Sequence, residues 1–276
     1  MGILLATLAS MFTGTGDFLG GLASRNGSVW GVGTWNHVAG AVVVPVLALA
    51  LGGEITIELL AWGSAAGIAG AVGVVALYAG FAQSSMSTVS PIAAVGSATW
   101  PVLWSMAHGD IPGGLVLIGI VLGIVAIWVV SGGSRTTLVG DPVGLKYGVI
   151  SGLGFGTMLI LLSFTADGSN IWALLPARIS GAVFLIIIAS RIGQPIHLPR
   201  RSWLLAVLAG TATVVGNGLF IISAGIESLA VATVLAAMFP ATTVLLAWLF
   251  LRERLTPRRV AGLALALVAV GLVAAG

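Results

Sequence analysis

The sequence predicts an all-α integral membrane protein with ten transmembrane helices, arranged as two inverted five-helix repeats. Three observations predict this fold class: the composition, the length of the apolar runs, and the distribution of basic residues among the loops. Of the 276 residues, 58% are hydrophobic and only 7% are charged, whereas a soluble domain carries about 25% charged residues. The charged side chains are therefore too few to cover the surface of a soluble protein of this length.

Apolar runs of about 20 residues recur along the chain, and this is the length that a helix needs to cross a bilayer. Continuous runs of this length favour helices over barrel strands, which alternate over about ten residues. The first run has no basic residue before Arg25, so we expect a retained helix and not a cleaved signal peptide. Hydropathy and helix breakers place the ten helices at about 2–23, 29–51, 59–82, 88–107, 113–131, 143–165, 170–190, 202–225, 228–250 and 258–275.

The basic residues are confined to alternate loops. The remaining four loops carry acidic residues only: Glu54, Glu58, Asp110, Asp167 and Glu227. Because cytoplasmic loops are enriched in Lys and Arg, this pattern predicts cytosolic odd-numbered loops, with both termini outside a plasma (inner) membrane. The odd-numbered loops hold ten of the eleven basic residues: Arg25, Arg135, Lys146, Arg191, Arg200, Arg201, Arg252, Arg254, Arg258 and Arg259.

Two local matches predict that the chain is internally duplicated. The stretch 153–158 matches 13–18, and the stretch 257–269 resembles 114–126 at nearly the same spacing. We therefore expect repeats at 1–137 and 138–276 within one membrane domain. Since five is an odd number, the second repeat would enter the membrane from the opposite side, which places a shared site near the midplane between the halves.

Asp17 lies inside the first apolar run, where a carboxylate costs about 2.5–3.5 kcal/mol. Asp17 belongs to a narrow stripe of small and polar residues on this predicted helix. Such a stripe faces other helices or a hydrated cavity, not lipid. We therefore predict that Asp17 faces a solute, ion or proton pathway; the alternative is a structural hydrogen bond to a neighbouring helix. Its neighbours at helical spacing form that stripe: Thr13, Gly14, Gly20 and Gly21.

Four more polar residues lie inside predicted spans. Counted along the helices, His37 lies at the depth of Asp17 near the inner side, whereas Arg178 and Asn217 share a level nearer the outer side. We predict that Asp17 and His37 hold or relay a proton, and that Arg178 binds a substrate carboxylate or pairs with Asp17 in one conformation. Structural ties between helices are the alternative for His37 and Arg178. Thr157, the repeat counterpart of Asp17, is a further candidate.

Trp100 and Trp104 share one face of the predicted helix 88–107. We expect them to wall the cavity from the outer half, with Tyr78 nearer the inside, because aromatic walls suit amphipathic or cationic solutes. Packing and interface roles are the alternative for both tryptophans.

Prolines interrupt two of the spans. Pro91 and Pro101 lie in the fourth predicted helix and Pro240 lies in the ninth. A proline inside a helix bends it and leaves carbonyl groups without partners. These helices are our candidates for bending gates, and static kinks are the alternative.

The ten-helix duplication, the G-T-G-D-F motif at 14–18 and the segment 223–256, which ends in L-R-E-R-L-T, resemble the drug/metabolite transporter superfamily, EamA type. The counterpart in the first half, H-G-D-I-P at 108–112, departs from that pattern and keeps only Asp110 in the acidic position. The resemblance covers nearly the whole chain. It implies a small-molecule carrier, commonly an exporter of amino acids or other metabolites.

The motifs that are absent argue against an enzyme. The chain has three histidines and no cysteine, and it lacks metalloprotease, nucleophile-elbow and Walker motifs. We expect no metal, no cofactor and no nucleic-acid partner. The hypothesis is a secondary transporter that exports a small organic solute by alternating access, with protons as a candidate coupling ion. A facilitative uniporter or importer and a non-transporting scaffold are the alternatives, and the sequence leaves monomer and homodimer open.

Overall fold

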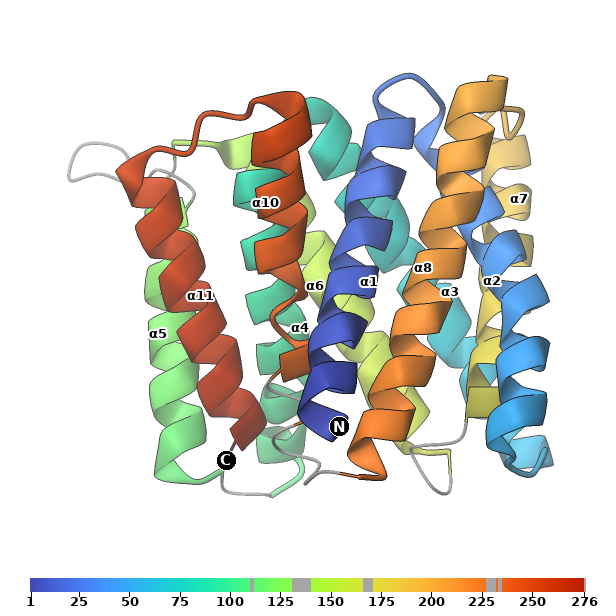
Figure 1. The fold of residues 1–276 in the computed structure, drawn as a ribbon, viewed down its shortest axis with the longest axis horizontal. Helices are drawn as coiled ribbons and strands as arrows, with labels where there is room; N and C mark the ends of the chain where they lie inside the picture. The colour runs from blue at the N-terminus through green and yellow to red at the C-terminus, as the bar shows by residue number, and fades with distance from the viewer. Residues whose placement is uncertain (110–111, 131–139, 166–170, 227–231, 233–234, 276) are drawn as a thin grey trace.

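The computed structural model describes residues 1–109, 112–130, 140–165, 171–226, 232 and 235–275 (Figure 1). All regular structure in this part of the chain is helical, which confirms the predicted all-α membrane fold. Several residues of the sequence argument lie outside the described residues: Asp110, Arg135, Asp167, Glu227 and the repeat boundary at 137–138.

Ten α-helices and one 3₁₀ turn, η1, make up the described structure. Nine of the ten predicted spans correspond to helical segments whose ends differ from the prediction by at most two residues, when η1 and α7 are taken together as the seventh segment. The elements are α1 (Gly2–Ser24), α2 (Val29–Leu51), α3 (Ile57–Gln83), α4 (Met86–Ala107), α5 (Gly114–Val130), α6 (Pro142–Ser163), η1 (Ile171–Ala173), α7 (Leu174–Arg191), α8 (Arg200–Ala224), α10 (Phe239–Leu251) and α11 (Pro257–Ala275).

The prediction of one unbroken helix over 228–250 is wrong at its centre. Ala237 and Met238 form a turn, and α10 begins at Phe239 with Pro240 in its first turn. Proline lacks the N–H that a helix interior requires, but the first turn of a helix needs no such donor. The break before Pro240 follows from this chemistry, whereas α4 continues through both of its prolines.

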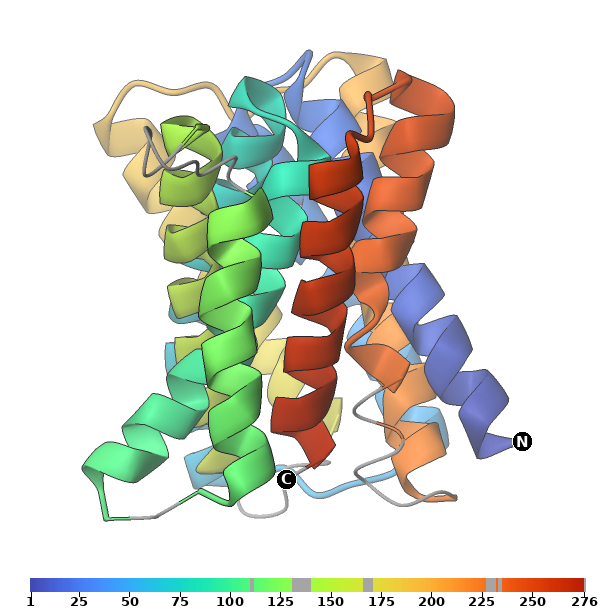
Figure 2. The ribbon, with the colours of Figure 1, turned by 90° about the vertical axis from the view of Figure 1, so that its left-hand side faces the viewer.

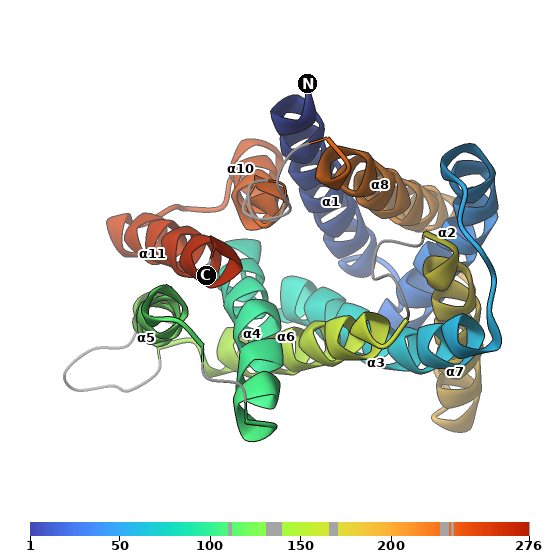
Figure 3. The same ribbon diagram turned by 90° about the horizontal axis from the view of Figure 1, so that it is seen from below.

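Eight of the helices form two layers, seen end-on in Figure 3. The first layer has the order α10, α1, α8, α2, and the second has the order α4, α6, α3, α7, with direct contacts between neighbours in each row. The remaining helices, α5 and α11, pack along one another at one edge (Figure 2). Each layer therefore combines helices from the first half of the chain with helices from the second half.

Reciprocal glycine contacts hold α1 against α8. A Cβ atom at Gly16 would lie 2.6 Å from Thr213 Oγ1, and one at Gly216 would lie 2.6 Å from Thr13 Oγ1. Small residues at these two positions let the helix backbones approach closely, as is typical of packing inside membranes.

The two ends of the molecule differ in charge. Both termini lie at one end, here called the terminal end, and the other end carries the α1–α2 connection, the last turns of α7 and α10 and the first turns of α8 and α11 (Figure 1). We call this second end the basic end. Its described basic residues are Arg25, Lys146, Arg191, Arg200, Arg201, Arg252, Arg254, Arg258 and Arg259.

The outer faces of the helices are apolar. Seven of the described helical segments are long and apolar enough to cross a membrane, and large aliphatic and aromatic side chains stand exposed on them and on the shorter helices. Ile124, Val42 and Phe250 are 63%, 69% and 70% exposed. Side chains of this kind are stable in contact with lipid, so the chain is a multi-pass integral membrane protein.

Candidate functional site

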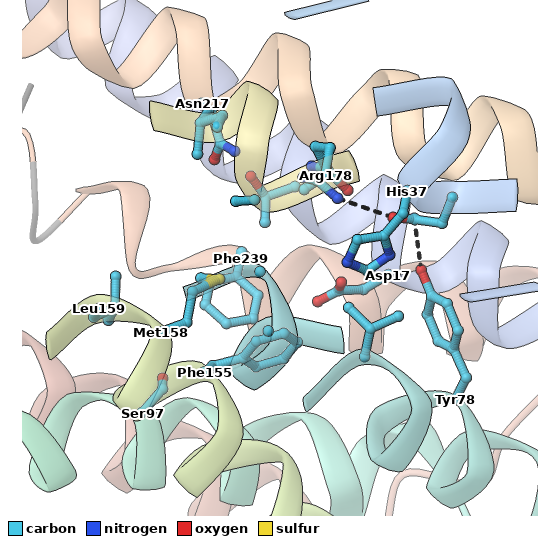
Figure 4. A pocket seen from close by; sticks show the side chains of 18 residues that line it. Asp17, His37, Tyr78, Ser97, Phe155, Met158, Leu159, Arg178, Asn217 and Phe239 are labelled. Carbon is cyan, nitrogen blue, oxygen red and sulfur yellow. Dashed lines mark hydrogen bonds between the residues drawn. The ribbon is translucent and has the colours of Figure 1, made fainter. Parts of the chain in front are cut away.

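A cavity of about 220 Å³, here called the inner cavity, lies between the two layers (Figure 4). All eight layer helices contribute to its wall. Its polar groups come mainly from α1, α2, α7 and α8, and its apolar part is formed by Val74, Phe155, Met158, Leu159, Leu174 and Phe239. A solute in this cavity would contact both halves of the chain at once.

A second cavity, of about 610 Å³, adjoins the first on the side of the terminal end. Its wall includes Val273 and Ala274, near the end of α11, together with Trp104. The inner cavity therefore continues toward the terminal end. The two cavities share five wall residues, which form the neck between them: Thr13, Ser97, Leu159, Asn217 and Phe239.

A chain of hydrogen bonds crosses the two layers at the inner cavity. Arg178 Nη1 in α7 donates to Asn36 Oδ1 in α2 at 3.0 Å, and Asn36 Nδ2 donates to Tyr78 Oη in α3 at 2.9 Å. Asn36 and Tyr78 are each 2% exposed and Arg178 is 9% exposed. Burial removes competing water, so these contacts hold the three side chains in one arrangement.

The stem of Arg178 passes over Gly40. A Cβ atom at Gly40 would lie 2.9 Å from Arg178 Cδ and 3.0 Å from its Nε, so a side chain there would displace the arginine. Among the described residues no ion pair joins Arg178 to a carboxylate. The guanidinium group lines the cavity, and its hydrogen-bond partner among the described residues is the neutral amide of Asn36.

His37 lies next to Asn36 and is 3% exposed. Its Nδ1 is 2.9 Å from the Gly33 carbonyl oxygen, and because a carbonyl group only accepts, Nδ1 carries a hydrogen atom. Nε2 is thereby left as the ring nitrogen that can gain or lose a proton. Asp17 and His37 both line the cavity (Figure 4).

Contacts to Glu253, which follows α10, join helices at the basic end. Its carboxylate accepts hydrogen bonds from the backbone N–H of Met86 and of Ser87, at 3.1 and 3.2 Å, in the first turn of α4. It also forms an ion pair of 3.2 Å with Arg25, at the end of α1. One carboxylate therefore joins α1 and α10 of the first layer to α4 of the second layer.

Comparison with known proteins identifies the family. The sequence model of the EamA-like transporter family matches residues 142–275. The second half of the chain belongs to the EamA-like transporter family. A solved crystal structure of a protein with 14% sequence identity shares the fold of this EamA-like chain, with a TM-score of 0.60 over 96% of this chain and 95% of that one. The comparison with curated protein sequences found no match to this chain.

Family membership establishes the broad class of function. EamA-like proteins are membrane transporters of small solutes, and the cavity between the layers of this chain has the size and chemistry to hold one. Among the described residues, no three His, Asp or Glu side chains gather as a candidate metal site.

The EamA-like fold brings five of the eight predicted site residues to the inner cavity: Asp17, His37, Tyr78, Arg178 and Asn217. Trp104 lines the larger cavity. The remaining two, Trp100 and Thr157, bond to each other, with Trp100 Nε1 donating to Thr157 Oγ1 at 3.0 Å. They line neither of these two cavities, and their bond joins α4 to α6.

The expected depth of Arg178 requires a correction. The sequence placed it with Asn217 on a level separate from His37, but its guanidinium group bonds to Asn36, the neighbour of His37. The long arginine side chain extends from one level to the other across Gly40, which has no side chain, so its charge lies well away from its Cα atom. Arg178, Asn36 and His37 therefore belong to one polar cluster.

Sequence reasoning missed two residues of this EamA-like site. Asn36 stands inside the apolar span 29–51, and a polar amide at that position was the available signal. Glu253 lies between Arg252 and Arg254 in a loop that the sequence predicts to be cytosolic. Its role depends on contacts with residues more than 160 positions away in the sequence, which no local pattern reveals.

Proposed function

We propose that this protein is a secondary transporter that exports small amphipathic organic solutes, amino acids or related metabolites, by alternating access. The observation that carries the proposal is the inner cavity. It lies between two layers, bears one acidic and one basic group and adjoins a larger cavity toward the terminal end, while Glu253 joins the layers at the basic end. A carrier caught with one side open has this form, because it admits solute from a single side.

The charges and walls of the cavity support an amphipathic, zwitterionic solute. Arg178 offers hydrogen bonds to a carboxylate, and planar guanidinium groups match that geometry. Asp17 offers a site for an ammonium group. Phe155, Met158 and Phe239 provide apolar contacts for a side chain. Aromatic and aliphatic amino acids combine these three features.

The layers support alternating access between inverted repeats, which we propose at 1–137 and 138–276. In these repeats α1 corresponds to α6, α2 to α7 and α3 to α8. If each helix is replaced by its counterpart, the contact of α1 with α8 becomes the contact of α6 with α3. In the same way, the contact of α2 with α8 becomes the contact of α7 with α3. This replacement interchanges the two layers. A rocking motion of one layer against the other would then open the basic end and close the terminal end.

We further propose that Asp17 and His37 couple transport to protons. Both side chains lie at the cavity, where solute and water meet them, and His37 Nε2 is free to change its protonation state while Nδ1 stays bonded to Gly33. Binding of a cationic group at Asp17 would compete with a proton there. That competition is the simplest physical route to solute–proton exchange.

The charge asymmetry supports an orientation with the basic end in the cytosol and both termini outside the plasma (inner) membrane. In this orientation the described conformation faces outward.

Flux into proteoliposomes tests the proposal. Purified protein should take up radiolabelled amino acids saturably, and a pH gradient should change the rate. Saturable flux that ignores the pH gradient would instead identify a facilitative uniporter. Solute-independent leakage would identify a channel, and the absence of flux for every solute would leave a non-transporting scaffold.

A further inference from the structure

The side chain of Asn36 uses both of its polar groups inside the protein. Its oxygen accepts from Arg178 Nη1 at 3.0 Å and its nitrogen donates to Tyr78 Oη at 2.9 Å. The orientation of the amide follows from chemistry, since a guanidinium group has no acceptor and must face the oxygen. Asn36 belongs to the first layer, whereas Arg178 and Tyr78 belong to the second, so this amide joins the layers at the inner cavity.

Arg178 is a buried cation with a neutral partner. A guanidinium group has five N–H donors, and the hydrogen bond to Asn36 is the one that Arg178 makes among the described residues. A charged group within a membrane span is costly, so such residues usually mark a solute or ion pathway. At the basic end the same kind of side chain, Arg25, pairs with the carboxylate of Glu253. The inner cavity uses an amide where a carboxylate would have neutralised the charge.

We propose that Asn36 is a positioning and specificity-determining residue, which aims the Arg178 guanidinium group into the cavity without neutralising it. The site thereby selects solutes that carry a carboxylate. Figure 4 shows Arg178 and Tyr78 at the inner cavity, with dashed lines for the two hydrogen bonds that they form with Asn36. This inference rests on the proposed function and deepens it, because it assigns the solute's acidic group to one side chain and names the residue that keeps that side chain available.

A purely structural role for Asn36 makes the opposite prediction for one substitution. If Asn36 only ties the layers together, Asn36→Asp should be tolerated, because the new carboxylate keeps the oxygen acceptor and forms a charge-assisted bond with Arg178. If Asn36 preserves the charge of Arg178, the same carboxylate occupies the guanidinium group and repels the acidic group of the solute. The variant would then stay folded and lose its preference for acids.

The experiment compares each solute with its uncharged analogue. Purified full-length protein is titrated with L-leucine, L-phenylalanine and L-methionine and with the three corresponding amino acid amides, and thermal stabilisation gives the affinity of each. In the unmodified protein each acid should bind at least about tenfold more tightly than its amide, as a hydrogen bond to a charged group implies. In Asn36→Asp this ratio should fall to about one or below. Asn26→Asp, at an exposed position at the basic end, is the matched control and should keep the ratio.

The outcomes separate the two proposals. If the unmodified protein binds none of the six solutes, or binds acids and amides equally, the proposed amino acid site is wrong. If it prefers the acids and Asn36→Asp prefers them equally, the role given to Asn36 is wrong while the site stands. If Asn36→Asp does not fold, Asn36→Leu decides: loss of the acid preference supports the positioning role, and an unchanged preference overturns it.

Discussion

Arg25 and Glu253 form an ion pair of 3.2 Å, which joins the end of α1 to the segment after α10 across 228 positions of sequence. The same carboxylate accepts from two backbone N–H groups in the first turn of α4. A helix N-terminus has unsatisfied donors and a partial positive charge, so a carboxylate there is stabilising. These contacts hold the two layers together at the basic end, and alternating access requires them to break.

Removal of this carboxylate should favour opening of the basic end. Glu253→Ala loses hydrogen bonds of the helix-capping kind, which contribute about 0.5–2 kcal/mol, so the population of the opened state should rise about twofold to thirtyfold. The chain has no cysteine, so a single Ala23→Cys reporter in the buried cluster at that end can measure this. A membrane-impermeant maleimide applied from the basic side should label it faster when Glu253→Ala is also present.

Arg254→Ala is the control for this measurement, because Arg254 is an exposed charge in the same connection. It should leave the labelling rate unchanged. If the single variant Ala23→Cys and the double variant with Glu253→Ala are labelled at equal rates, this carboxylate does not hold the basic end closed.

The proton-coupling proposal predicts separate effects on driven and passive transport. Asp17→Asn keeps the size and the polarity of the side chain but cannot take up or release a proton. Solute uptake driven by a pH gradient should fall at least about tenfold. Solute exchange without a gradient should persist when it is measured at saturating solute, which offsets the weaker contact with the ammonium group, because the cavity is retained. His37→Ala should show the same pattern. Gradient-driven flux at the unmodified rate in both variants would eliminate the relay and leave transport itself intact.

The bond between Trp100 and Thr157 predicts an effect on stability without an effect on solute affinity. Thr157→Val replaces the hydroxyl acceptor of the Trp100 indole N–H with a methyl group of similar size. Interhelical hydrogen bonds inside membranes contribute about 0.6–1.7 kcal/mol, so the melting temperature should decrease, whereas Thr157→Ser should retain it. A change in solute affinity with unchanged stability would instead make Thr157 a cavity residue.

The sequence predicted the spans well because each is an apolar run bounded by turn-forming or charged residues. The second span, for example, is predicted and observed at 29–51. Asp17 and Arg178 could be singled out because a charge in such a run stands out against its neighbours. The break before Phe239 was harder to predict, since a proline permits either continuation of the helix, as in α4, or a new helix start, as at Pro240.

Contacts between distant helices were the main limit of prediction. Trp100 and Trp104 share a helical face in the sequence, but the neighbouring helix α6 divides that face, so that one indole bonds to Thr157 and the other reaches a cavity. Asn36 acquires its importance only when Arg178 and Tyr78 approach it from two other helices. Such meetings depend on layer packing, which apolar periodicity does not encode.

The central claim is that the cavity holding Arg178 is the transport site, and flux through a pair of matched variants tests it most directly. Arg178→Met and Arg191→Met remove the same charge from the same helix, the first at the inner cavity and the second at the exposed basic end of α7. In proteoliposomes of equal protein content, Arg191→Met should transport amino acids at the unmodified rate, whereas Arg178→Met should lose at least about tenfold while it stays folded. Equal transport by the two variants would contradict the claim.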